Sequence, residues 1–162
     1  MLSKLHKSKK DQGFTIIEVL IVLAIAGLIL LVVFLAVPAL QRNSRNTQRK
    51  DDVARIGSAV QEYLNNNNGN ITGMNSGGIQ GLLGTLAYYG TTDVTVAGAA
   101  NNNVANDTGV DNVKVYTGAK CAPLGGNQSG MGATSANASS RQIAIVYSSE
   151  TSGGSAKLCT DS

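Results

Sequence analysis

A carboxylic acid at the start of a long apolar segment limits what this chain can be more than any other feature. Glu18 is followed by residues 19–37, which contain no polar side chain. An unpaired carboxylate in hydrocarbon costs several kcal/mol, so such residues are rare in membrane segments and usually have a specific partner. We therefore treat Glu18 as a candidate functional residue.

The apolar segment is long enough to cross a bilayer. Val19 to Leu40 would extend roughly 33 Å as a helix, at about 1.5 Å per residue. A secretory signal peptide would have a shorter apolar core, of about 7–15 residues, followed by a small-residue cleavage site. Residues 34–38 make a poor site of that kind, so we expect the segment to stay in the mature protein. Pro38 predicts a kink in it.

A basic stretch precedes this segment and ends in glycine. Residues 1–13 carry a net charge of +3, from four lysines and one aspartate, which equals the formal net charge of the whole chain. The remainder is therefore balanced, with a basic patch from Arg42 to Arg55. Its outer part, residues 56–162, has a net charge of −2, which does not favour bulk nucleic-acid binding. Gly13 suits proteolysis because a residue without Cβ lets a protease approach the backbone closely.

The basic leader, the Gly13-Phe14 junction and Glu18 together resemble the N-terminal segment of type IV pilins. The resemblance extends over residues 1–64. It implies that prepilin peptidase cuts between Gly13 and Phe14 on the cytoplasmic side of the membrane, and that the new Phe14 amine is methylated. It also implies a role for Glu18 in subunit assembly. Glu18 can stabilise its own helix dipole, or pair with the Phe14 amine of a neighbouring subunit.

The same resemblance and the residue pattern predict the domain organisation. We expect a cleaved leader (1–13), a transmembrane and assembly helix (14–40), an amphipathic helix (41–68) and a globular head (69–162). Five apolar residues at helical spacing predict that the amphipathic helix docks on the head: Val53, Ile56, Val60, Tyr63 and Leu64. Asparagine and glycine at 65–69 should end the helix, because both tolerate a left-handed cap.

A row of arginines lies on one face of the amphipathic helix, at Arg42, Arg45 and Arg49. Such rows are typical of a solvated face or of contacts with lipid headgroups. We expect these side chains to meet headgroups or neighbouring subunits rather than DNA.

The head is predicted to contain a small antiparallel sheet. Strand candidates lie at 94–96, 113–116 and 143–147, separated by turn-rich segments at 98–109 and 124–140. Residues 79–89 read as a short amphipathic helix or turn. An antiparallel meander packed on the long helix gives an α+β fold.

The only cysteines are Cys121 and Cys159. Their placement resembles the C-terminal disulfide loop of many type IV pilins, and an oxidising location favours pairing. Such a bond would stabilise the fold by about 4 kcal/mol in the chain-entropy account. Two free thiols are the alternative. A metal or catalytic site would call for other spacing and a histidine partner.

Other candidate sites are weaker. The Asn- and Asp-rich stretch 101–112 lacks a full calcium-loop signature, so we expect a polar turn. Glycosylation sequons begin at Asn70, Asn106, Asn127 and Asn137. The single histidine, His6, is in the leader, so the mature chain has poor means for acid–base chemistry near neutral pH. We predict no enzymatic activity, no cofactor and no metal.

The predicted function is that of a structural subunit of an extracellular type IV pilus filament, serving adhesion, twitching motility or DNA uptake. Before assembly the subunit would be a single-pass membrane protein surrounded by lipid. Its expected partners are copies of itself, prepilin peptidase and the pilus assembly machinery of the inner membrane; DNA is possible but unsupported. A minor pilin, a type II secretion pseudopilin and a membrane-anchored binding domain remain alternatives.

Overall fold

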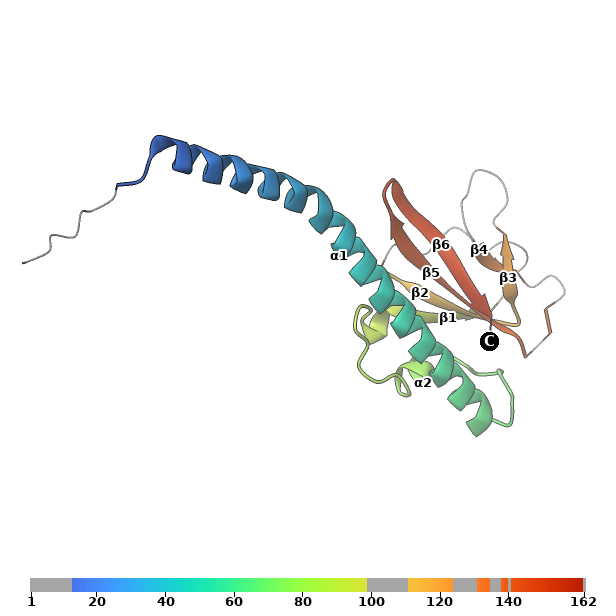
Figure 1. Ribbon diagram of the computed structural model, residues 1–162. Coiled ribbons are helices and arrows are strands. Elements are labelled where there is room, and N and C mark those ends of the chain that lie inside the picture. The colour runs from blue at the N-terminus through green and yellow to red at the C-terminus, as the bar shows by residue number, and fades with distance from the viewer. Residues whose placement is uncertain (1–12, 99–110, 124–130, 135–137, 140, 162) are drawn as a thin grey trace, which may run out of the picture. The chain divides into compact units, whose positions relative to one another are not determined.

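The computed structural model describes residues 13–98, 111–123, 131–134, 138–139 and 141–161 (Figure 1). The chain divides into two compact units, residues 1–40 and 41–162. Helix α1 (Ile16–Asn66) contributes to both units, and Pro38 lies within it. The name head is kept for residues 69–162, which belong to the second unit. Residues 1–12 of the predicted leader and the sequons at Asn106, Asn127 and Asn137 lie outside the described residues, as does most of the predicted polar turn at 101–112.

The first unit consists of the apolar part of α1. Its large apolar side chains, from Ile16 to Leu40, are 39–81% exposed around the whole helix. A helix that is apolar all round is normally buried in lipid or among other helices. Within the described residues, α1 is the one helix long and apolar enough to cross a membrane.

The second unit has an α+β fold, as predicted. Its main sheet has four strands in the order β1-β2-β5-β6, and their bounds are β1 Val94–Gly98, β2 Val113–Thr117, β5 Ile143–Thr151 and β6 Gly154–Asp161. The β2–β5 and β5–β6 pairs are antiparallel, whereas β1 and β2 are parallel. The sheet is therefore mixed rather than a pure antiparallel meander. Parallel strands need a connection of about a dozen residues or more, and residues 99–112 are long enough to provide it.

Three strands were not predicted from the sequence. β3 (Lys120–Pro123) and β4 (Met131–Thr134) form a separate antiparallel pair, and β6 extends the main sheet beyond β5. Glycine, alanine and serine are frequent in β4 and β6. Such residues have low strand propensity, so it is the pairing with a neighbour that makes these segments strands.

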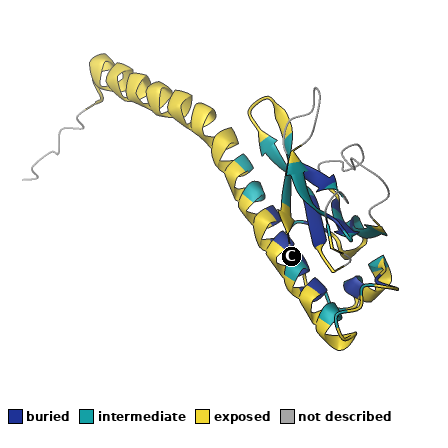
Figure 2. Cartoon of the chain, turned by 90° about the vertical axis from the view of Figure 1, so that its right-hand side faces the viewer, coloured by how far each residue is buried: buried dark blue, intermediate teal, exposed yellow. Residues whose placement is uncertain are grey.

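The core lies between α1 and one face of the sheet. Val53, Ile56 and Val60 of α1 are at most 5% exposed and pack with Val113 and Ile145 of the sheet. Figure 2 shows the buried residues of this half of α1 on its sheet-facing side. The predicted apolar stripe is thus confirmed. A second buried cluster contains residues from the β2, β4 and β5 strands and from the turn after β2: Tyr116, Ala119, Ala133, Ala144 and Val146.

The connection between α1 and the sheet begins with a left-handed cap. Asn68 and Gly69 have positive φ angles of 54° and 75°, and the Gly69 N–H donates to the Leu64 carbonyl at 2.7 Å. This confirms the predicted helix stop. The short helix α2 (Ser76–Gln80) and the 3-10 turn η1 (Thr91–Asp93) follow. The predicted element at 79–89 is therefore mainly irregular chain after a short helix.

Candidate assembly site

The junction before α1 is open to solvent. Phe14 is 90% exposed, and Gly13 is exposed as well. A Cβ added at Gly13 would meet nothing within 4 Å. Packing among the described residues therefore does not require glycine at this position.

Thr15 and Glu18 form a capping box at the start of α1. The Thr15 backbone N–H and hydroxyl donate to Glu18 Oε2 at 2.8 and 2.6 Å, and the Glu18 N–H donates to Thr15 Oγ1 at 3.3 Å. The first amides of a helix have no intrahelical acceptor, and this reciprocal pattern satisfies two donors. Thr15 was not predicted as part of this site, although the Thr-x-x-Glu spacing is a local sequence signal for a capping box.

The cap uses only part of the Glu18 carboxylate. Both bonds from Thr15 end on Oε2, and among the described residues nothing donates to Oε1. A carboxylate can accept several hydrogen bonds at once. The two roles predicted for Glu18 are therefore compatible: one oxygen caps the residue's own helix while the other remains open to a cation from outside.

Comparison with known proteins identifies this region. Residues 8–34 match the prokaryotic N-terminal methylation motif. This match supports a type IV pilin-like or pseudopilin protein. Its class III leader implies processing by prepilin peptidase and assembly by a pilus machinery, and it suits a membrane-anchored precursor. No curated protein and no solved structure matches the chain.

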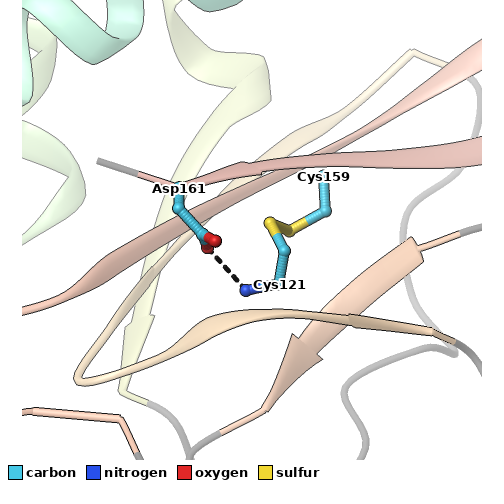
Figure 3. A group of neighbouring side chains, drawn as sticks. All are labelled: Cys121, Cys159 and Asp161. Carbon is cyan, nitrogen blue, oxygen red and sulfur yellow. Dashed lines mark hydrogen bonds between the residues drawn. A yellow bond between two sulfur atoms is a disulfide. The ribbon is translucent and has the colours of Figure 1, made fainter.

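The head contains one disulfide, between Cys121 and Cys159, with a Cα–Cα distance of 5.6 Å. It joins β3 to β6, as Figure 3 shows, and confirms the predicted pairing. Asp161 accepts a hydrogen bond from the Cys121 N–H. Asp161 and the two cysteines form a cluster of potential metal ligands. The disulfide, however, leaves no free thiolate in this cluster.

The arginine row has a different role from the one predicted. Arg45 binds Glu150 of β5 through Nε at 3.0 Å and Nη2 at 2.6 Å, and Arg49 Nη2 binds the same carboxylate at 2.9 Å. Arg49 is only 1% exposed. The expectation of a headgroup-facing or subunit-facing row is therefore wrong for these two residues, because β5 brings an acid from far along the chain. The hydrogen bond from Arg45 holds the pKa of Glu150 below its usual range, and Arg49 adds to this effect.

Asp52 of α1 holds the loop that precedes β1. Asp52 is fully buried and accepts the backbone N–H groups of Ala87, Tyr88 and Tyr89 at 2.7, 2.7 and 3.0 Å. The Tyr88 hydroxyl accepts from Arg49 and donates to Asp111 at 2.8 Å. Burial raises the pKa of Tyr88. This network had no local sequence signal, since its partners are distant in the chain.

Proposed function

We propose that this chain is the structural subunit of an extracellular type IV pilus filament. The observation that carries the proposal is the apolar part of α1, whose large side chains are exposed on all sides. Lipid would cover this surface in the precursor, and the same segments of other copies would cover it in the filament. In this function the head has no enzymatic role, and neither a cofactor nor a metal takes part.

Proteolysis would act as the assembly switch. Cutting between Gly13 and Phe14 removes the lysine-rich leader and creates an α-amino group four residues before Glu18. N-methylation of Phe14 leaves that amine able to carry a positive charge. The open oxygen of Glu18 then offers a partner for the amine of an incoming copy. In a water-free helix bundle, this pairing offsets the cost of burying both charges.

The pairing also explains why a filament would form. The amine of one copy and the carboxylate of another are different surfaces, so the contact is head-to-tail. A head-to-tail contact that does not close into a ring produces a helical fibre. Moving apolar helices from lipid into such a bundle exchanges one apolar environment for another, so the charged pair supplies specificity.

The methylation motif is shared by pilins, minor pilins and type II secretion pseudopilins. The disulfide between Cys121 and Cys159 favours a pilin, because such a C-terminal loop is common in pilins and less typical of major pseudopilins. A minor pilin or pseudopilin is the second candidate. Adhesion, twitching motility and DNA uptake are the uses we propose for a filament of this subunit.

The direct test is mass spectrometry of filaments sheared from cells that express the full chain. We expect this chain to be the most abundant protein, starting at N-methylated Phe14. A trace amount in filaments made of another subunit would indicate a minor pilin. Retention in the cell envelope, with no surface filament, would indicate a pseudopilin. An intact leader in surface material would contradict the processing step.

A further inference from the structure

The last residues of β5 lie beside the first turns of α1 in the second unit. The pairing of β5 with β2 ends at Val146, opposite Lys114, but β5 continues to Thr151. Asn46 of α1 binds the backbone of β5 beyond this point. Its Nδ2 donates to the Glu150 carbonyl at 2.8 Å, and its Oδ1 accepts from the Glu150 N–H at 2.8 Å. One side-chain amide thus takes the place of a neighbouring strand.

The side chain of Glu150 binds the same part of α1. Its carboxylate accepts from Arg45 and from Arg49. Among the described residues, the hydrogen bonds that join Arg45 and Asn46 to the sheet all involve Glu150, as acceptor or as donor. One residue of the sheet therefore holds the segment of α1 that follows the apolar part.

A second group of contacts holds the rest of α1 without Glu150. Arg49 also bonds to Tyr88 and lies 3.8 Å from a carboxylate oxygen of Asp111. Asp52 binds three backbone amides of the loop at 87–89. The buried stripe that begins at Val53 then packs on the sheet. From Arg49 onward, α1 is attached by contacts that would survive the loss of Glu150.

The two groups differ in exposure. The side chains of Arg45 and Glu150 are 42% and 21% exposed, whereas Asp52 is fully buried. Partly hydrated ion pairs are weak and are screened by salt. Buried, fully bonded groups are costly to separate. The contact between Arg45 and Glu150 is therefore weaker than the contacts of Asp52.

We propose that Glu150, with Arg45 and Asn46, is a latch that releases residues 41–48 of α1 from the sheet while the head stays folded. When the latch opens, these residues become a free section of helix about 12 Å long. Opening stops at Arg49, which keeps its contacts with Tyr88 and Asp111. The part of α1 that is not attached to the sheet is therefore shorter when the latch is closed and longer when it is open.

Double electron–electron resonance on the full chain in detergent micelles tests this proposal. Spin labels at Thr47→Cys and Ser152→Cys report on the latch, since both sites are exposed and lie on its two sides. Labels at Ser58→Cys and Thr91→Cys, also exposed, report on the attachment of the rest of α1 to the head. The native disulfide stays oxidised throughout.

With Glu150→Ala, we expect the Thr47–Ser152 distance distribution to broaden and its mean to lengthen, while the Ser58–Thr91 distribution stays unchanged. Asn46→Ala should give the same result in milder form, and it replaces Glu150→Ala if that variant does not fold. Glu62→Ala changes an exposed glutamate of the same helix and should leave both distributions alone. High salt should broaden the first distribution in the unmodified chain.

Two results would overturn the latch. Unchanged distributions in both Glu150→Ala and Asn46→Ala would show that other contacts hold residues 41–48. Broadening of both label pairs together would show that Glu150 is an integral part of the folded head and that no separate opening exists.

Discussion

Glu18 accepts hydrogen bonds from both the backbone N–H and the hydroxyl of Thr15, at 2.8 and 2.6 Å. The acid at the start of the apolar segment is thus bound within its own helix before any neighbour is present. Since these bonds use only Oε2, the cap and an intersubunit pair are separable functions. Substitutions at the two residues can distinguish them.

We predict that Glu18→Val gives processed subunits that accumulate in the membrane and form few or no filaments. Valine keeps the segment apolar, and cleavage depends mainly on Gly13 and the leader, so insertion and processing should continue. What is lost is the partner for the Phe14 amine of the adjoining copy. Immunoblots of membrane and sheared-filament fractions measure both quantities.

Glu18→Gln and Thr15→Ala separate charge from capping. Glutamine can still complete a capping box but carries no charge. We expect it to be as defective in filament formation as valine. Thr15→Ala loses a cap worth about 1 kcal/mol but keeps the carboxylate, and should still assemble. Normal filaments from Glu18→Gln would show that the carboxylate serves only as a cap.

Asp52 provides a prediction about stability. Replacing it with alanine leaves three backbone amides at 87–89 without their acceptor. A buried donor without a partner costs about 1–3 kcal/mol, so Asp52→Ala should lower the free energy of unfolding by at least that amount. Urea denaturation of the oxidised full chain measures the change. Asp51→Ala is the matched control, because Asp51 is the exposed neighbour on the same helix and should have little effect.

The sequence predicted what depends on local pattern. The apolar stripe on α1, the Asn68-Gly69 cap and the apolar segment could all be derived from spacing and residue type, as could the strands with β-branched residues. The partners that Arg45, Arg49 and Asp52 find outside α1 could not, because each lies 35 or more residues away in the chain. Arginines at helical spacing look the same whether they face lipid or an acid brought in by β5.

The direction of the β1–β2 pair was also beyond local pattern. An alternating apolar strand such as Val113–Thr117 fits a parallel or an antiparallel neighbour equally well. Thr15 is a different case. Its signal, the Thr-x-x-Glu spacing that ends at Glu18, is local and could have been read from the sequence.

The ion pairs of Glu150 should make stability depend on pH. Arg45, and to a lesser extent Arg49, lower the pKa of the folded-state carboxyl below its ordinary value of 4.5. The stabilisation is therefore complete above that value and is lost as pH falls through the folded-state pKa. Two further titratable groups, Tyr88 and Asp111, face Arg49 in this cluster.

Thermal unfolding of the unmodified chain and of Glu150→Gln between pH 6 and pH 3 tests this dependence. We expect the unmodified chain to be the more stable at pH 6 and the difference to shrink below pH 4.5. A difference that stays constant over the whole range would show that the charge of Glu150 contributes nothing.

The disulfide provides the last prediction. Because Cys121 and Cys159 are bonded, alkylation of the denatured, non-reduced chain should label neither, and labelling should become complete after reduction.

The bond closes a loop with a sequence separation of 38 residues. In the chain-entropy account, its removal should cost about 4 kcal/mol. The double variant Cys121→Ser/Cys159→Ser measures that cost without leaving a free thiol. It should still bury the core between α1 and the sheet, since neither cysteine belongs to that cluster. We therefore expect a native-like circular dichroism spectrum, a lower unfolding midpoint and a smaller yield of assembled filaments. Quantitative labelling of both thiols in native extracellular protein would contradict the pairing.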